Sequence, residues 1–377
     1  MELTHLVITC GGTGGHFYPG LTIAREQLAQ GRKVLLLLSG INSATQSAIA
    51  AKYQIPCCVL PKMPSLHSPG KFFLGLIGGT FKSLRELRRF RAQALLGMGS
   101  FASLPAVIGA KLCGIPVFLH DGNARIGKAN RVISSISRYL YAAFPPVNAA
   151  TIKCPWQVTG MPVRPELRRC HGIGKAECIE KLNQLYNSEL RADLPTILVF
   201  GGSQGAAVFN DCFPQAFCRI AEPTFQVLHL AGKNKLAETS AIYRHAAFPV
   251  LALEASERME LFFGACDLVI SRSGGSSIAE ITIFGRPAIL IPYPFAAEGH
   301  QKDNADFLVS RNAAVAIANQ ELTVERAEGL TRDFLENREI WRERGKNAAK
   351  LAKTEAAEAI LKSISAQLSG QTKKGRP

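Results

Sequence analysis

Residues 6–19 read LVITCGGTGGHFYP, and this stretch decides the fold of the first half of the chain. A short apolar run ends in two pairs of glycines, and an apolar stretch of helical length follows. This order predicts a buried strand, a tight turn and a helix. Residues 196–210, TILVFGGSQGAAVFN, repeat the order about 190 residues later. The chain is therefore predicted to contain the same architecture twice.

Short apolar runs alternate with longer amphipathic stretches in both halves. The further runs are 33–38, 94–98, 116–119 and 139–144 in the first half, and 225–230, 267–271 and 287–292 in the second. Such alternation is typical of parallel sheets covered by helices on both faces. We expect an α/β protein of two doubly wound, Rossmann-like domains that face each other across a cleft. Ligands of such sheets bind beyond the carboxyl ends of the strands.

Composition and charge narrow the class of protein. With 377 residues, of which 47 % are hydrophobic and 19 % charged, the chain suits two globular domains. Lys and Arg outnumber Asp and Glu by 44 to 29, which favours an anionic partner: nucleic acid, a phosphorylated substrate or a membrane surface. No basic segment interleaved with base-stacking aromatics is present, so we expect no nucleic-acid partner. No cofactor is expected, because neither glycine loop fits G-x-x-x-x-G-K-[ST] and no acid follows the run 33–38 to hold a ribose. No metal site is expected either, because the ten cysteines form no C-x-x-C pair and no D-x-D occurs.

Polar residues at predicted strand ends suggest a ligand site in the second half. The segment SRSGGSSIAE, 271–280, opens a helix with small residues, whose free amides can hold an anion. Glu280 lies one turn inside that helix, where it either binds a ribose diol or serves as an ordinary first-turn acid. Asn123 and Gln301 follow strand ends and suit sugar hydroxyls, although amides at such positions are also common helix caps.

Seven segments resemble, in order and spacing, the MurG family of peptidoglycan N-acetylglucosaminyltransferases. They are GGTGGH, GMGSFASLP (97–105), HDGN (120–123), GMPVR (160–164), GGSQGA, RSGGSSIAE and the HQ..NA of 300–305. The resemblance runs from about residue 5 to residue 365. It implies the GT-B fold and transfer of N-acetylglucosamine, with inversion, from UDP-N-acetylglucosamine to the C4 hydroxyl of muramoyl-pentapeptide diphosphoundecaprenol (lipid I), which gives lipid II. It also implies a peripheral position on the cytoplasmic face of the bacterial plasma membrane, and cell-wall synthesis and division proteins as partners.

The resemblance also implies a division of labour along the chain. Residues 1–163, with a C-terminal helix at about 341–368, would form the acceptor-binding, membrane-facing domain. Residues 164–340 would form the UDP-sugar-binding domain, and residues 369–377 a basic tail.

The residues that the resemblance assigns to substrate binding fall into four groups. Thr13, Gly14 and Gly15 would contact the donor sugar or the acceptor diphosphate, and Asn123 a sugar hydroxyl. Arg164 and Ser203 would contact the nucleotide diphosphate, Ser256 would contact uracil and Gln301 the donor sugar. A helix start would hold the phosphates and the ribose through Gly275, Ser276, Ser277, Ile278, Ala279 and Glu280. The sequence departs from the family pattern at Asp121-Gly122-Asn123, where the family has an acid, a glutamine and an asparagine, and at Ser276 and Ser277.

His16 directly follows the first glycine loop. A neutral imidazole there can accept the proton of the attacking sugar hydroxyl, whereas a charged imidazole can bind the acceptor diphosphate. Asp121, at a predicted strand end, is a rival base. The sequence leaves both choices open.

Residues 69–91, PGKFFLGLIGGTFKSLRELRRFR, predict a membrane-binding segment with a basic surplus that includes Lys71 and Arg85. We expect a glycine-rich loop that inserts apolar side chains, and a following helix whose apolar stripe is core. The insertion candidates are Phe72, Phe73, Leu74, Leu76 and Ile77, and the stripe is Phe81, Leu84, Leu87 and Phe90. Residues 1–10 show no signal peptide, and the apolar runs are shorter than the roughly 20 residues that a spanning helix needs.

Two other functions fit the same pattern. One is a GT-B transferase that acts on another lipid acceptor, such as diacylglycerol. The other is a non-catalytic protein that binds nucleotide sugars.

Overall fold

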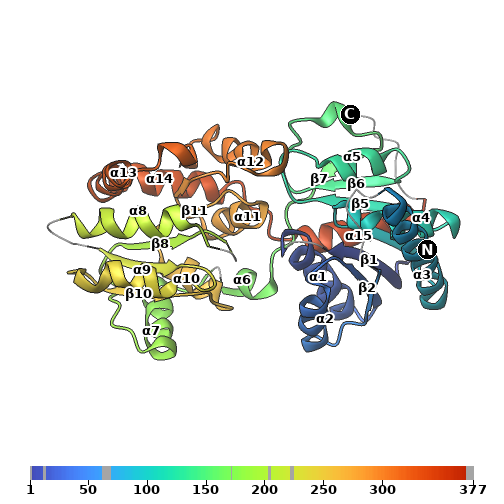
Figure 1. The fold of residues 1–377 in the computed structure, drawn as a ribbon, viewed down its shortest axis with the longest axis horizontal. Coiled ribbons are helices and arrows are strands. Elements are labelled where there is room, and N and C mark those ends of the chain that lie inside the picture. Colours follow the sequence, from blue (N-terminus) through green and yellow to red (C-terminus); the bar gives the residue numbers. More distant parts are fainter. Residues whose placement is uncertain are drawn as a thin grey trace. The chain divides into compact units, whose positions relative to one another are not determined.

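The computed structural model describes residues 2–11, 14–61, 69–170, 172–202, 205–220 and 225–370. It divides the chain into two compact units, shown in Figure 1. The N-terminal unit consists of Met1–Arg164 together with Lys353–Pro377, and the C-terminal unit of Pro165–Ala352. Each unit is built on one parallel sheet.

The sheet of the N-terminal unit has seven strands in the order β3-β2-β1-β4-β5-β6-β7. Its strands are β1 His5–Gly11, β2 Lys33–Ser39, β3 Cys57–Val59, β4 Ala94–Gly97, β5 Val117–Asp121, β6 Tyr139–Ala142 and β7 Trp156–Val158. Its helices are α1 Gly14–Ala29, α2 Ser43–Lys52, α3 Pro69–Phe90, α4 Leu104–Leu112, α5 Lys128–Ser134 and α15 Ala356–Leu368.

Both faces of this sheet are covered, because successive residues of a strand point to opposite sides. In β1, Leu6 and Ile8 join a core with α1 and α15. Val7 joins a second core with residues of α3, α4 and α5. Burial on both sides explains why the strands read as unbroken apolar runs in the sequence.

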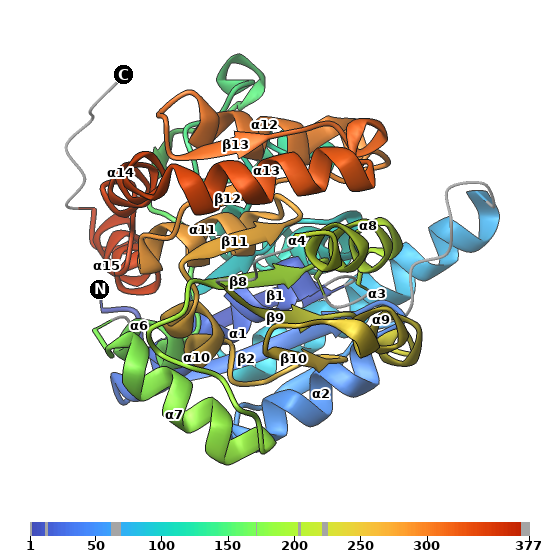
Figure 2. The ribbon, with the colours of Figure 1, turned by 90° about the vertical axis from the view of Figure 1, so that its left-hand side faces the viewer.

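The sheet of the C-terminal unit has six strands in the order β10-β9-β8-β11-β12-β13. Its strands are β8 Thr196–Phe200, β9 Gln226–Leu230, β10 Val250–Leu253, β11 Leu268–Ser271, β12 Ala288–Leu290 and β13 Ala314–Ala316. Its helices are α6 Pro165–Cys170, α7 Lys175–Tyr186, α8 Ala207–Cys218, α9 Leu236–Ile242, α10 Met259–Ala265, α11 Gly275–Phe284, α12 His300–Val309, α13 Val324–Glu336 and α14 Arg338–Ala349. Helices α8 and α13 pack side by side on one face through Phe209, Phe213, Leu330 and Phe334 (Figure 2).

The expected single helix at about 341–368 is wrong, because this segment forms α14 and α15, which belong to different units. Helix α14 packs tightly on α11: a Cβ on Gly345 would lie 2.6 Å from the carbonyl oxygen of Gly285. Helix α15 instead buries Ile360 and Ile364 against α1 and β1. The helix breaks because its two halves pack against separate cores.

Helix α3 also corrects a prediction. Residues 72–77 lie within this helix of 22 residues and not in a loop. Its exposed apolar side chains are Phe73 (60 %), Leu74 (72 %), Ile77 (52 %) and Phe81 (70 %). Phe81 was expected in the core, but only Leu87 of the predicted stripe is fully buried. Phe72 and Leu76 are half-buried, and Arg85 is exposed. The side chain of Lys71 lies outside the described part of the structure.

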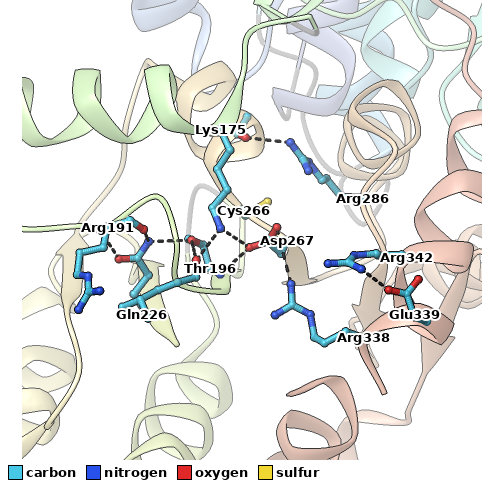
Figure 3. Close-up of polar contacts among 12 residues, drawn as sticks. Lys175, Arg191, Thr196, Gln226, Cys266, Asp267, Arg286, Arg338, Glu339 and Arg342 are labelled. Atoms are coloured by element: carbon cyan, nitrogen blue, oxygen red, sulfur yellow. Dashed lines mark hydrogen bonds and ion pairs between the residues drawn. The ribbon is translucent and has the colours of Figure 1, made fainter. Parts of the chain in front are cut away.

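An ionic cluster ties three elements to the start of β11 (Figure 3). The carboxylate of Asp267 lies 2.6 Å from Lys175 Nζ at the start of α7. It also accepts a hydrogen bond of 2.8 Å from the backbone N–H of Thr196. Arg338 of α14 lies 4.0 Å away on the other carboxylate oxygen. Asp267 thus joins α7, β8 and α14 at the amino ends of the strands. The glycine turn of this unit lies at the opposite, carboxyl end.

We predict that Asp267→Asn destabilises the C-terminal unit by about 1–2 kcal/mol, because the donors of a partly buried, charge-assisted network lose the carboxylate that they share. Urea unfolding followed by circular dichroism measures the loss. Asp193→Asn is the matched control, since Asp193 forms an exposed ion pair with Arg191, and it should leave the transition almost unchanged. Equal effects of the two substitutions would contradict the prediction.

Candidate functional site

Each sheet has a point at which the chain connections reverse direction. In the N-terminal unit it lies between β1 and β4, and in the C-terminal unit between β8 and β11. Loops that leave the carboxyl ends of such strand pairs diverge and leave room for a ligand. Both glycine-rich turns begin at these points, as do the GMGS and RSGGSS segments.

The first glycine turn depends on a close backbone approach. A Cβ on Gly11 would stand 2.2 Å from the carbonyl oxygen of Ser39, at the end of the neighbouring β2. Gly14 and Gly15 are exposed and open α1, so their amides belong to the first turn of a long helix, which has no acceptors within the helix itself. Thr13, the other predicted ligand of this turn, lies outside the described residues.

His16 lies in the first turn of α1 and is half-buried. Its ring packs against the turn after β4: a Cβ on Gly99 would lie 3.1 Å from His16 Cδ2 and 3.2 Å from Nε2. Gly99 has a φ of +95°, which also favours glycine. The structure therefore brings His16 to the reversal point of the first sheet.

Asp121 closes the same site from the end of β5. It is only 5 % exposed, and its carboxylate accepts hydrogen bonds from Asn123 N (3.1 Å), Gly127 N (2.9 Å) and Asn130 Nδ2 (3.0 Å). Burial raises the pKa of the Asp121 carboxyl, although these donors and the charge of His16 act in the opposite direction. Asn123 is half-buried, on the segment that this carboxylate holds.

Gly122 brings the β5 end next to the first glycine turn. A Cβ there would lie 2.9 Å from Met161 Cε and 4.0 Å from the carbonyl oxygen of Gly15. The preceding His120 is buried, which lowers its pKa to about 4, so its imidazole is neutral at pH 7. The ends of β1, β4 and β5 therefore meet at one site, which contains the titratable groups His16 and Asp121.

The second glycine turn repeats the backbone constraint of the first. Gly205 has a φ of +65°, and a Cβ there would stand 2.0 Å from the carbonyl oxygen of Ala231, beyond the end of β9. Ser203 lies outside the described residues. Arg164, the last residue of the N-terminal unit before α6, is half-buried.

Helix α11 starts without a capping side chain, because its N-cap residue is Gly274. Its first-turn amides can therefore bind an anion. Gly275, Ile278 and Ala279 are buried, so the last two can contribute only backbone groups to a ligand. Ser276, Ser277 and Glu280 are half-buried.

The start of α12 is tied to the loop before α11. Ser273 Oγ donates to the carbonyl oxygen of Gln301 at 2.7 Å, and Asn304 Nδ2 donates to the carbonyl oxygen of Ser273 at 2.9 Å. The side-chain oxygen of Gln301 accepts from Tyr293 N at 2.9 Å, so its amide nitrogen is the group suited to a ligand. Asn304 is fully buried and acts as a structural link.

Arg272 is a site residue that the sequence did not reveal. Its guanidinium donates to the carbonyl oxygens of Ile291 (3.0 Å) and Pro292 (3.2 Å) and stacks over the ring of Phe209. It holds the loop after β12 beside the start of α11. The pattern that could have identified Arg272 is its place directly after the apolar run DLVIS, at a predicted strand end.

Ser256 also lies beyond the carboxyl end of a strand of this parallel sheet. It follows β10, the edge strand two positions from β8. Its hydroxyl lies 2.9 Å from Tyr186 Oη and accepts from Arg258 N at 3.0 Å. The side chain is used within the protein, so a contact to uracil would fall to the backbone, and that contact stays a prediction.

No cluster of three or more His, Cys, Asp or Glu side chains suited to a metal ion occurs among the described residues. Within the same part of the chain, no helix is long and apolar enough to cross a membrane.

Comparison with known proteins identifies the class. Residues 6–141 match the glycosyltransferase family 28 N-terminal domain, and residues 196–360 match the family 28 C-terminal domain. With one doubly wound sheet in each half, these matches define a glycosyltransferase of the GT-B fold. The expected fold class is confirmed.

Full-length relatives identify the family more closely. The chain is 31 % identical to the UDP-N-acetylglucosamine–N-acetylmuramyl-(pentapeptide) pyrophosphoryl-undecaprenol N-acetylglucosamine transferase of Citrifermentans bemidjiense, over 95 % of this chain and 98 % of that protein. It is 33 % identical to the transferase of the same name from Cupriavidus pinatubonensis, over 94 % and 96 %. The crystal structure of Acinetobacter baumannii MurG is similar with a TM-score of 0.77 at 26 % identity, covering 96 % of this chain and 99 % of that one. The chain belongs to the MurG family.

Proposed function

We propose that the protein transfers N-acetylglucosamine from UDP-N-acetylglucosamine to the C4 hydroxyl of lipid I, with inversion, and so forms lipid II in peptidoglycan synthesis. The observation that carries this proposal is the similarity to named transferases over 95 % of the chain. In support of it, Gly14, Gly15 and the start of α11, which the resemblance assigned to substrates, follow strands at the two reversal points.

The C-terminal unit supports the donor half of the reaction. The uncapped amides of α11 suit the diphosphate of the nucleotide, and Glu280 suits the ribose diol. As the bond from the anomeric carbon to the diphosphate breaks, negative charge grows on the leaving UDP. The oriented amides of α11 stabilise that charge without reorganisation. We assign Arg164, the residue before α6, to the same diphosphate. Gln301, held by Tyr293 N, presents its amide to the donor sugar.

The N-terminal unit supports the acceptor half. His16 lies among the ends of β1, β4 and β5, next to exposed glycine amides that suit a diphosphate. We assign it the general-base role: the imidazole accepts the proton of the C4 hydroxyl as that oxygen forms its bond to the anomeric carbon. Asp121 is the weaker base because both of its oxygens already accept hydrogen bonds.

Helix α3 supports attachment to the membrane surface. Phe73, Ile77 and Phe81 follow one another at intervals of four residues and are exposed, so they form one apolar ridge. Arg85, Arg88 and Arg89 continue the helix and are also exposed. Each basic residue near anionic lipid adds about 1 kcal/mol to binding. We propose a peripheral position on the cytoplasmic face of the plasma membrane; cell-wall and division proteins as partners stay a prediction.

The transfer itself is tested with radiolabelled UDP-N-acetylglucosamine and a short-chain lipid I analogue in the presence of a chelator. We expect labelled lipid II. Diacylglycerol is the control acceptor: label on diacylglycerol and none on lipid I would favour the other lipid transferase. Binding of UDP-N-acetylglucosamine without transfer to either acceptor would favour a non-catalytic binding protein.

We predict that Phe73→Ser with Phe81→Ser releases the protein from liposomes that contain anionic lipid, because the apolar ridge of α3 is lost. Flotation in a density gradient measures the bound fraction. The matched control is Val132→Ser with Val147→Ser, which removes two other exposed apolar side chains of the N-terminal unit. Flotation of the α3 variant equal to that of the control would rule out this surface.

We predict that His16→Ala folds, binds UDP normally and loses ~10²–10⁴-fold in kcat with lipid I, as expected for loss of a general base. Steady-state kinetics at limiting and saturating acceptor measures the change. A rise in KM for lipid I at unchanged kcat would instead assign His16 to acceptor binding. Near-wild-type values of kcat and of KM for lipid I would show that His16 only packs against its neighbours.

A further inference from the structure

His229 is a fully buried histidine of the C-terminal unit that the proposed reaction does not use. It lies next to the carboxyl end of β9. Its Nδ1 lies 2.8 Å from the hydroxyl oxygen of Tyr243, and its Nε2 lies 3.1 Å from Oδ1 of Asn210 near the start of α8. Burial lowers the pKa of His229 to about 3. The ring is therefore neutral at pH 7 and carries a single N–H, whose place decides the direction of both hydrogen bonds.

Asn210 fixes that direction. Its amide nitrogen Nδ2 donates to the carbonyl oxygen of Ala231 at 2.8 Å, and an oxygen at that place could not donate. The side-chain oxygen of Asn210 therefore faces His229, where it accepts from the ring. The proton must be on Nε2, so Nδ1 accepts from the hydroxyl group of Tyr243. The three bonds form one chain of donors, which runs from Tyr243 through His229 and Asn210 to Ala231.

This chain ends on the carbonyl group against which the second glycine turn packs. A Cβ on Gly205 would stand 2.0 Å from the Ala231 oxygen and 2.9 Å from its carbonyl carbon. The backbone N–H of Asn210 donates to the carbonyl oxygen of Ala206, directly after Gly205, at 3.1 Å. Asn210 thus holds the end of the turn with its backbone and the end of β9 with its side chain.

The start of α8 is linked in turn to the rest of the reversal point between β8 and β11. The Arg272 guanidinium carbon, beyond β11, lies 4.7 Å from the centre of the Phe209 ring on α8. The same guanidinium donates to the carbonyl oxygens of Ile291 and Pro292 beside the start of α11. The contacts of α8 therefore extend to the segment where the proposed function places the nucleotide diphosphate.

We propose that His229 is a positioning residue of the donor site: through Asn210 and Ala231 it holds the glycine turn and the start of α8 in the geometry that binds the nucleotide diphosphate. The inference rests on the proposed function and deepens it. His229 does not touch the substrate, and no proton moves along the chain. Its N–H occupies the Asn210 oxygen and thereby directs the amide nitrogen to Ala231.

The place of the ring proton is measured by NMR in the substrate-free protein at pH 7. The nitrogen chemical shifts of isotope-labelled histidine distinguish the two neutral forms, and the His229→Gln variant identifies the signal among eight histidines. We expect the proton on Nε2. A proton on Nδ1 would break the chain at Asn210 and overturn the proposal. Because this measurement needs no substrate, it remains possible for a wild-type protein that binds no UDP, a result that would contradict the proposed function.

Two uncharged variants each keep one half of the arrangement. The amide nitrogen of Gln is as many bonds from Cβ as Nε2, so His229→Gln keeps a donor for Asn210. The amide of Asn ends where Nδ1 lies, so His229→Asn keeps only a partner for Tyr243. We expect His229→Asn to weaken UDP binding about tenfold, and His229→Gln by no more than about twofold, as the loss or retention of one buried hydrogen bond implies. Calorimetry measures the Kd of UDP, and KM for the lipid I analogue should change in neither variant.

Gln226→Asn is the matched control. Gln226 is fully buried on the same strand but at its amino end, where its amide donates to Arg191 and Thr196 (Figure 3). This substitution should lower the midpoint of urea unfolding and leave the Kd of UDP unchanged. A Kd that changed as much as in His229→Asn would mean that any loss of stability weakens binding, and would overturn the proposal.

Equal UDP affinity of folded His229→Asn and His229→Gln would also overturn the proposal. Should His229→Asn fail to fold, Asn210→Ala takes its place, because it removes the same link at the start of α8 and should weaken UDP binding to a similar extent. An unchanged Kd in Asn210→Ala would contradict the positioning role as well.

Discussion

Both sites depend on a glycine in one turn of each unit, at a position where the neighbouring backbone leaves no room for a side chain. After β1 the chain passes so close to the end of β2 that a Cβ on Gly11 would collide with the Ser39 carbonyl group. Beyond β8, Gly205 passes equally close to Ala231, which follows β9. Any side chain at either position would force the turn away from its neighbouring strand. The helix that follows would then start elsewhere, and its amides would no longer face the reversal point of the sheet.

The two sites built on this shared constraint differ in their chemistry. The site of the N-terminal unit contains an imidazole and a buried carboxylate, which can exchange or stabilise a proton. The site of the C-terminal unit offers the amides of α11, two serine hydroxyls and the Gln301 amide, which can stabilise charge and bind hydroxyls. An inverting sugar transfer needs both kinds of group, one at the attacking oxygen and one at the leaving group. In the proposed reaction, each kind of group comes from a separate sheet.

Much of the fold could be predicted, because buried parallel strands leave a direct signal in the sequence. The run 33–38 became β2 Lys33–Ser39, and the run 225–230 became β9 Gln226–Leu230. Helix α3 was partly missed because Gly75, Gly78 and Gly79 suggested a loop. Yet Gly79 lies where a Cβ would meet Pro105 of α4 at 2.9 Å, so part of the glycine content serves helix packing. The anchoring roles of Arg272 and Asn304 depend on contacts between distant segments, which no local pattern reveals.

The return of α15 to the first unit has a consequence for the order in which the protein folds. Ile360, Leu361 and Ile364 complete a core that begins with Leu6 and Ile8. A ribosome makes the whole C-terminal unit before it reaches these residues. Until then α1 covers this face of the sheet without α15, at a stage when chaperones act and aggregation is possible. The core of the N-terminal unit can therefore be completed only after Ile364 has been made, and a core substitution near residue 360 would destabilise the part of the molecule that was made first.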